Sequence, residues 1–291
     1  MDFLRRLRTN YRSWLGSLNQ IKSLQDYSQR LVEFEIEAYL KTHLDQNPRY
    51  ADPQRLNQYE RKVYSQCGED GILAEIFQRI GIEHHYFVEF GVGDGLENNT
   101  AYLLIQHWKG LWIEANPVFV DRIKTHLKAA IVQHHLHLKP AFVYPENIEI
   151  FLDEMQVPET FDLLSIDIDG NDYWVWQAIT KYRPRVVVIE YNATYPPPIS
   201  WVMTYNPNYS SSQTTYFGAS LFSLEKLAAQ KGYRLVGCSF SGVNAFFVRE
   251  DLVGDRFCEP YTALNHYEPP RYFLVDRNVG HARAFGEFEQ I

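Results

Sequence analysis

Four short stretches decide the fold: YFVEFGVGDG at residues 86–95, LWIEANP at 111–117, FDLLSIDIDGND at 161–172 and RVVVIEYN at 185–192. In each of them a run of apolar residues ends in glycine, an acidic residue or asparagine. Short apolar runs that are bounded in this way are typical of buried strands. Because the polar residues follow the strands, we expect them to meet at the carboxyl edge of a parallel sheet.

Segments with helical spacing separate these strands, and further short apolar runs follow them. Alternation of strands and helices predicts a mainly parallel sheet that is covered on both faces. The fold class is therefore α/β: a Rossmann-like, seven-stranded, mostly parallel sheet with helices on both faces, plus an N-terminal helical extension. The helices are expected at 67–80, 98–107, 118–127, 148–155, 173–182 and 221–231, and the remaining strands at 141–144, 234–238 and 244–249.

The chain is expected to have three segments. Residues 1–61 form a helical N-terminal extension with two helical runs, residues 62–250 form the main domain, and residues 251–291 form an irregular C-terminal tail. The extension is interpreted as a cap or as a contact between copies in a homo-oligomer. A membrane-surface helix is the alternative, because Arg5, Arg6, Arg8 and Arg12 lie beside Phe3, Leu4 and Trp14.

Composition excludes several classes of protein. The 291 residues carry a formal net charge of -8, yet residues 1–62 hold 11 basic and 8 acidic residues, so the acidity lies in the main domain. An acidic domain repels phosphate backbones, which argues against a nucleic-acid partner. Three well-separated cysteines, no secretory signal and no apolar run long enough for stable membrane insertion favour a cytoplasmic protein.

The glycine-rich turn after the first strand is a candidate cofactor site. Gly91, Gly93 and Gly95 allow close approach of the backbone to a ligand, and Glu114 ends the second strand, where an acid can bind a ribose. A nicotinamide dinucleotide is disfavoured because the third glycine comes one residue early. The acidic residues of this turn also repel a pyrophosphate. A ligand with ammonium and sulfonium groups, such as S-adenosylmethionine, suits the turn better.

Together, the four stretches resemble the motifs of class I S-adenosylmethionine-dependent methyltransferases. The segment YSQCGED at 64–70 and the triplet Asn98-Asn99-Thr100 are similar to FkbM-type members, and the resemblance covers about residues 62–250. The resemblance implies the fold and the cofactor but leaves the substrate open. It implies that the cofactor is bound by Ser65, Gln66, Glu89, Gly91, Gly93, Asn99 and Glu114.

Acidic residues at the ends of the fourth and fifth strands form a candidate metal site. Asp167 and Asp169 are two residues apart, as are Glu190 and Asn192, so each pair is expected to share a face. Oxygen ligands of this kind suit Mg²⁺, and Asp167, Glu190 and Asn192 are the expected ligands. Asp167 and Asp169 are the candidate catalytic residues. Without a metal, Asp169 is the candidate general base, or it only caps the following helix.

A long loop at 192–218 is expected to cover the site as a lid. It contains four prolines and many aromatic and hydroxyl side chains, and no charged residue lies between Tyr191 and Ser220. Such a surface suits a sugar or a polyketide-like molecule, through stacking and hydrogen bonds. Tyr195, Trp201 and Tyr205 are the candidate substrate-binding residues. A lid that packs only on its own domain is the alternative.

The expected function is methyl transfer from S-adenosylmethionine to a hydroxyl group of a small molecule or glycan, with a divalent cation such as Mg²⁺ as a candidate second cofactor. Two other functions stay open at this point. An NAD(P)-dependent oxidoreductase would use the same glycine turn, and a non-catalytic binding protein would keep the fold without the reaction.

Overall fold

The computed structural model describes residues 2–210, 213–275 and 280–291. Residues 211–212 of the predicted loop and 276–279 of the predicted tail lie outside the described residues. The chain divides into two compact units, Met1–Ala51 and Asp52–Ile291. Residues 52–61 thus pack within the second unit, where Leu56 and Asn57 are buried. The boundary lies nearer to residue 51 than to the predicted residue 61.

The first unit is almost entirely helical. Its main element is α1 (Asp2–Leu40), followed by the π-helical turn η1 (Lys41–Asp45) and the short 3₁₀ helix η2 (Pro48–Tyr50). We expected two helical runs here, but α1 is continuous because the sequence between Leu18 and Leu24 contains neither glycine nor proline. The side chain of Asn47 accepts a hydrogen bond from the backbone N–H of Arg49, which caps η2.

The second unit is built on one seven-stranded sheet with the order β3-β2-β1-β4-β5-β8-β7. The first five strands in this order pair in parallel, and β8 pairs antiparallel with both β5 and β7. The predicted seven-stranded, mostly parallel fold is confirmed. Its strands are β1 (Tyr86–Phe90), β2 (Lys109–Glu114), β3 (Leu136–Pro140), β4 (Leu163–Ile166), β5 (Val186–Glu190), β7 (Tyr233–Cys238) and β8 (Asn244–Arg249).

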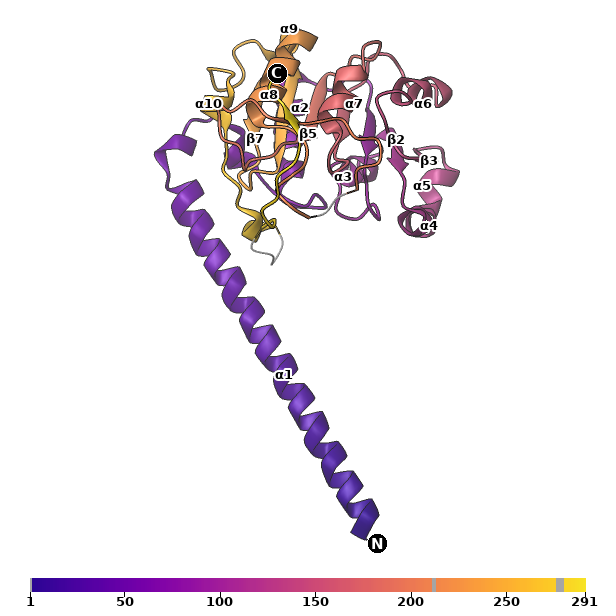
Figure 1. Cartoon of the computed structure of the whole chain (residues 1–291), viewed down its shortest axis with the longest axis vertical. Helices are drawn as coiled ribbons and strands as arrows, with labels where there is room; N and C mark the ends of the chain where they lie inside the picture. Colours follow the sequence, from indigo (N-terminus) through magenta and orange to yellow (C-terminus); the bar gives the residue numbers. More distant parts are fainter. Residues whose placement is uncertain (1, 211–212, 276–279) are drawn as a thin grey trace. The chain divides into compact units, whose positions relative to one another are not determined.

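Helices cover both faces of this sheet (Figure 1). One apolar cluster joins the sheet to α6, α7 and α8, and the other joins it to α2, α3, α4 and α9. Strand β5 shows why, since Val187 and Ile189 enter the first cluster whereas Val186 and Val188 enter the second. The helices are α2 (Glu69–Ile80), α3 (Ala101–Ile105), α4 (Pro117–His126), α5 (Lys128–Val132), α6 (Ile148–Glu154), α7 (Asp172–Ala178), α8 (Leu221–Lys231), α9 (Glu250–Val253) and α10 (Ala263–His266), with the 3₁₀ helices η3 (Leu56–Tyr59) and η4 (Tyr272–Leu274).

The third strand lies earlier in the chain than we predicted. The apolar run at 141–144 indicated a strand there, but β3 is Leu136–Pro140. This strand is at the edge of the sheet, and Leu136 is its one buried residue. An edge strand with one mostly exposed face can carry histidine and lysine, so it lacks the apolar run of a central strand.

A buried ion pair fastens the amino edge of the sheet, opposite the candidate site. Asp162 precedes β4, and its side chain is fully buried; Arg185 precedes β5 and lies 2.7 Å from it. Asp162 also accepts hydrogen bonds from the backbone N–H groups of residues 83–85. Arg185 donates to the carbonyl groups of Ile80 and Gly81. These bonds tie the end of α2 and the starts of β1, β4 and β5 together.

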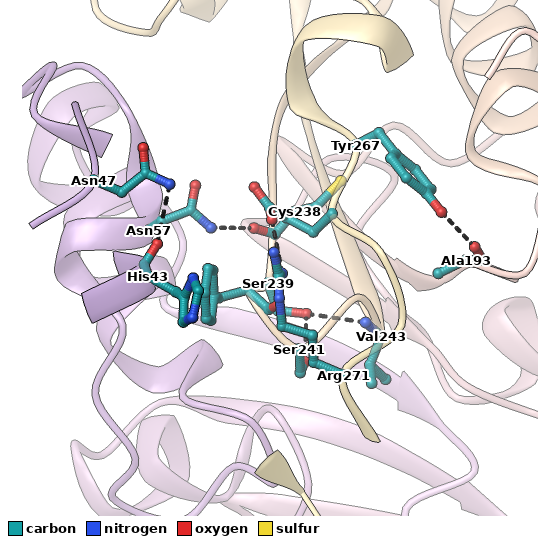
Figure 2. A network of polar contacts seen from close by, with 12 residues as sticks. His43, Asn47, Asn57, Ala193, Cys238, Ser239, Ser241, Val243, Tyr267 and Arg271 are labelled. Atoms are coloured by element: carbon teal, nitrogen blue, oxygen red, sulfur yellow. Dashed lines mark hydrogen bonds and ion pairs between the residues drawn. The ribbon is translucent and has the colours of Figure 1, made fainter. Parts of the chain in front are cut away.

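The C-terminal segment, residues 251–291, binds at the carboxyl edge of the main sheet. The hydroxyl of Tyr267 donates to the carbonyl of Ala193 at 2.6 Å, as Figure 2 shows, and the hydroxyl of Tyr191 donates to the carbonyl of Glu268 at 2.7 Å. A second, two-stranded sheet joins β6 (Val202–Met203) to β9 (Phe288–Glu289). The segment therefore lies over the carboxyl edge of the main sheet, together with the long loop.

No helix in the described part of the chain has both the length and the apolar character required to cross a lipid bilayer.

Candidate functional site

The glycine turn after β1 packs directly against the end of β4. Gly91 has a φ of +73°, and a Cβ atom placed there would lie 1.7 Å from the carbonyl oxygen of Asp167. Only glycine fits this close approach. Gly93, with a φ of +57°, has open space around the position of a Cβ atom. The backbone at Gly93 is therefore open to a ligand. It lies where the strand order of the sheet reverses, and this is the place where ligands bind in α/β folds.

Glu114, at the end of β2, lies beside this space. One carboxylate oxygen accepts a hydrogen bond from the backbone N–H of Gly93 at 2.9 Å, and the other accepts one from the N–H of Asn116 at 2.7 Å. The residue is almost completely buried. The two bonds hold the carboxylate against the glycine turn and leave lone pairs on both oxygens, and its predicted contact with a ribose stays a prediction.

Glu89 has a structural role that we did not predict. Its buried carboxylate accepts hydrogen bonds from Asn98, Asn99, Thr100 and Ser165, including a bond of 2.6 Å from the Thr100 hydroxyl. Burial raises the pKa of Glu89, and these hydrogen bonds oppose the rise. The bonds fix the segment before α3 onto β1. The predicted contact of Glu89 with the cofactor stays a prediction, whereas its hydrogen bonds to the segment before α3 are visible in the structure.

Asn99 belongs to the same network, because its side-chain amide donates to the Ser165 hydroxyl at 3.0 Å. Serine at 165, on β4, in turn donates to Glu89 at 3.1 Å. Asn99 is nearly buried. The predicted cofactor contact of Asn99 thus stays a prediction, whereas its link between β4 and the turn after β1 is visible in the structure.

The segment that precedes α2 is held by one carboxylate. Asp70 accepts hydrogen bonds from the backbone N–H groups of residues 63–65 and from the Ser65 hydroxyl. Ser65 is fully buried and committed to this network, whereas Gln66 is exposed. Of the two predicted cofactor residues in this segment, only Gln66 therefore presents its side chain to solvent.

Three carboxylates gather at the ends of β4 and β5. Asp167, Asp169 and Glu190 each offer an oxygen atom, and these atoms lie within 4.8 Å of one another. Burial is the largest cause of a raised pKa in all three, and repulsion from neighbouring carboxylates raises the pKa of Asp167 and Glu190 further. Among the described residues, no hydrogen bond or ion pair to these carboxylates is recorded. The chemistry of the group, oxygen donors with concentrated negative charge, fits a hard divalent cation.

We expected strand alternation to align these carboxylates, but the structure brings them together in a different way. Strand β4 ends at Ile166, so Asp167 and Asp169 belong to the following turn, where Asp169 has a φ of +60°. Asp172 shapes this turn by accepting hydrogen bonds from the N–H groups of Ile168 and Gly170, both at 2.8 Å. Burial raises the pKa of Asp172 to about 6. Asp169 is not the N-terminal cap of α7, a position that Asn171 occupies.

Asn192, which we predicted as a metal ligand, makes several hydrogen bonds within the chain, and its role as a ligand stays a prediction. Its side-chain amide donates to the carbonyl groups of Thr215 and Phe217, and its oxygen accepts a hydrogen bond from the N–H of Thr194. The residue is fully buried. Because β5 ends at Glu190, the alternation that would have aligned Asn192 with it does not continue. Among the carboxylates, Asp169 joins Asp167 and Glu190.

The long loop lies on the turn that carries Asp169. The side chain of Asn171 donates to the carbonyl of Asn206 at 2.8 Å. A Cβ atom at Gly170 would lie 2.4 Å from the ring of Tyr209. These contacts place the uncharged, aromatic loop next to the turn that carries Asp169, and its role as a lid stays a prediction.

The predicted substrate-binding residues differ in their accessibility. Trp201 is 4% exposed, and its ring stacks on Tyr195 with 4.3 Å between the ring centres. Trp201 therefore forms the core of the loop, and no open face of it is left for a substrate. Tyr195 is half-buried in that stack. Tyr205 donates a hydrogen bond to Glu146 and lines a cavity of about 440 Å³ together with Trp174.

The C-terminal segment contributes two residues that we did not predict. The hydroxyl of Tyr272 is buried and has no hydrogen-bond partner in the described residues. Burial and, after it, the Glu190 carboxylate raise the pKa of Tyr272. His281 packs on Tyr272 with 4.9 Å between the ring centres, and its electrostatic interaction with Asp169 opposes the rise in the pKa of that carboxyl group. No motif in residues 251–291 indicated this, because the placement depends on long-range contacts.

No protein-family model matches the sequence, and no curated protein matches it. The FkbM-type resemblance therefore stays a prediction.

Solved structures of methyltransferases are similar to the chain at low identity. A candidate caffeoyl-CoA O-methyltransferase from Staphylococcus aureus is 14% identical, with a TM-score of 0.46, over 74% of this chain and 99% of that one. The methyltransferase domain of bacterial CtHen1-C is 13% identical, with a TM-score of 0.40, over 63% and 97%. The glycopeptide N-methyltransferase MtfA is 15% identical, with a TM-score of 0.38, over 62% and 95%. We base the fold on the strand order and register alone.

Proposed function

We propose that this chain is an S-adenosylmethionine-dependent methyltransferase that acts on a hydroxyl group of a small molecule or glycan. The observation that carries the proposal is the junction of the glycine turn with the end of β4, where Gly91 meets the carbonyl of Asp167. This junction brings the candidate cofactor side, Gly93 and Glu114, next to the candidate catalytic side, Asp167 and Asp169.

The residues at the glycine turn fit the cofactor. Free backbone at Gly93 allows the close approach that a bound nucleoside requires, and the buried Glu114 carboxylate can accept hydrogen bonds from ribose hydroxyls. The acidic surroundings favour a cationic ligand over a pyrophosphate. When bound, S-adenosylmethionine supplies an electrophilic methyl group on its sulfonium.

The carboxylates on the catalytic side have a defined task in this proposal. Asp169 is exposed on its turn, so without a bound metal one of its carboxylate oxygens is available to accept the proton of a substrate hydroxyl. Asp167, Asp169 and Glu190 would hold a divalent cation such as Mg²⁺, which lowers the pKa of a bound hydroxyl. The aromatic loop orients the substrate, through Tyr209 and the cavity beside Tyr205.

The proposal is tested by calorimetry on the purified chain with S-adenosylmethionine, S-adenosylhomocysteine and NAD. We expect the first two to bind and NAD not to bind. The variant Gly93→Ala places a methyl group in the open space beside Glu114, and it should weaken binding by on the order of tenfold or more. Gly232→Ala is the matched control, because Gly232 also has a positive φ, +80°, and lies at the opposite edge of the sheet, next to Tyr233.

Three results would contradict the proposal. Binding of NAD alone would assign the chain to the nicotinamide-dependent oxidoreductases. Binding of none of the three ligands would favour a non-catalytic protein with this fold. Equal affinity of Gly93→Ala and Gly232→Ala for S-adenosylhomocysteine would move the ligand away from the glycine turn.

A further inference from the structure

Helix α1 presents an apolar seam along one side. Leu24, Tyr27, Leu31, Phe34 and Ala38 recur with alternating spacings of three and four residues, which is the pattern of the a and d positions of a heptad repeat. The four larger side chains are between 46% and 68% exposed. A soluble helix rarely leaves such a seam open to water, because each large apolar side chain gains about 1.5–3 kcal/mol on burial.

We infer that this seam pairs with the seam of a second copy of the chain in a parallel, two-stranded coiled coil. With Leu24 and Leu31 at a positions, Arg30 is at position g and Glu35 at position e of the next heptad. In a parallel pair, g of one helix faces the e that follows five residues later on the other helix. Arg30 and Glu35 therefore form an oppositely charged pair twice, once on each side of the dimer.

A second apolar run precedes the seam but is one residue out of its heptad register, because Leu24 follows Ile21 by three residues and not by four. From Leu4 to Ile21, apolar residues recur at the same two spacings, and α1 is continuous through this range. A helix without a partner is only marginally stable in water, since most helix stability in proteins comes from packing of an apolar face. The exposed seam of α1 therefore needs a partner helix, and a second copy of the chain supplies one with the same seam.

Charge argues for a second copy over a membrane surface. The part of the helical unit that bears the seam, residues 20–45, is net acidic, whereas helices on anionic membranes carry basic residues on the polar face. The acidic residues are Asp26, Glu33, Glu35, Glu37 and Asp45, and the basic ones are Lys22, Arg30 and Lys41.

Sedimentation equilibrium of the full chain tests the inference. We expect a dimer for the natural sequence. Arg30→Glu and Glu35→Arg each replace two attractive pairs by two repulsive ones, so each variant alone should dimerise more weakly, by on the order of tenfold. An equimolar mixture of the two variants restores both attractive pairs and should recover the original affinity. Lys22→Glu, with the same charge change at an outward f position, is the matched control and should dimerise normally.

A parallel pair places residue 30 opposite residue 35, so reversal of either charge alone acts on the same two pairs. A monomeric natural sequence would overturn the inference. So would a mixture that associates no better than either variant alone. Binding of the monomeric chain to anionic phosphatidylserine vesicles would assign the seam to a membrane surface instead.

Discussion

Neutralising Glu190 should stabilise the protein, because its carboxylate belongs to a group whose oxygen atoms lie within 4.8 Å of one another. At that distance, two unit charges repel by about 3.5 kcal/mol for an effective dielectric constant of about 20. Asp169 is exposed, so solvent weakens its repulsion with Glu190. Asp167 is half-buried, so its repulsion with Glu190 is screened less. For Glu190→Gln we expect a gain of about 2 kcal/mol, which corresponds to a melting temperature higher by about 6 °C for a domain of this size.

The gain should depend on pH. Burial raises the pKa values of Asp167, Asp169 and Glu190 above the ordinary 3.8 of Asp and 4.5 of Glu. Repulsion from neighbouring carboxylates raises the pKa values of Asp167 and Glu190 further. The folded state then binds protons more tightly than the unfolded state, so the cost of the cluster is absent at low pH and grows as pH rises through the raised pKa values. The difference between Glu190→Gln and the natural sequence should therefore be larger at about pH 8 than at about pH 5.

Thermal unfolding, followed by fluorescence, measures both effects. Magnesium chloride, compared with sodium chloride of equal ionic strength, should raise the melting temperature of the natural sequence at about pH 8 and have little effect on Glu190→Gln. Asp121→Asn is the control, because that carboxylate is 82% exposed and should change neither value. A lower melting temperature for Glu190→Gln at both pH values, or an equal response to magnesium, would refute the reasoning.

Two further substitutions test the close contact at Gly91 and the buried ion pair of Asp162 with Arg185. Gly91→Ala should cost more than about 3 kcal/mol in unfolding free energy, because its Cβ meets the Asp167 carbonyl, whereas Gly81→Ala, with a φ of +75° and no neighbour within 4 Å, should cost only about 1–2 kcal/mol. Arg185→Met leaves the fully buried Asp162 without its counter-charge and should cost about 3–5 kcal/mol; a loss below about 1 kcal/mol in urea unfolding would contradict this.

Much of the fold could be predicted from local sequence. The central strands are buried on both faces, so Val186 to Ile189 form an unbroken apolar run that is easy to recognise. Edge strands lack that signal, and β3 was placed a few residues too late for this reason. Which acidic residues gather at the carboxyl edge also followed from the strand order, since β4 and β5 are neighbours.

The roles of individual site residues were harder to predict. Glu89 is the next-to-last residue of β1, and Glu114 is the last residue of β2. Glu89 accepts a hydrogen bond from the N–H of Asn99, whereas Glu114 accepts one from the N–H of Gly93, beside the open space. Asn192 lies beyond the end of β5, where the period of two no longer applies. Tyr272 reaches Glu190 only through contacts between distant parts of the chain, and no local pattern encodes those.

The pairing of the long loop with the C-terminal segment has a consequence for biosynthesis. The Tyr216 hydroxyl donates to the carbonyl of Glu287, 71 residues later, and the N–H of Ala284 donates to the Thr215 hydroxyl across 69 residues. All strands of the main sheet precede residue 250 and leave the ribosome earlier. The glycine turn and the carboxylates can therefore adopt their positions before the C-terminal segment is available to bind the long loop. In the nascent chain, the carboxyl edge of the main sheet is therefore complete before the segment that covers it.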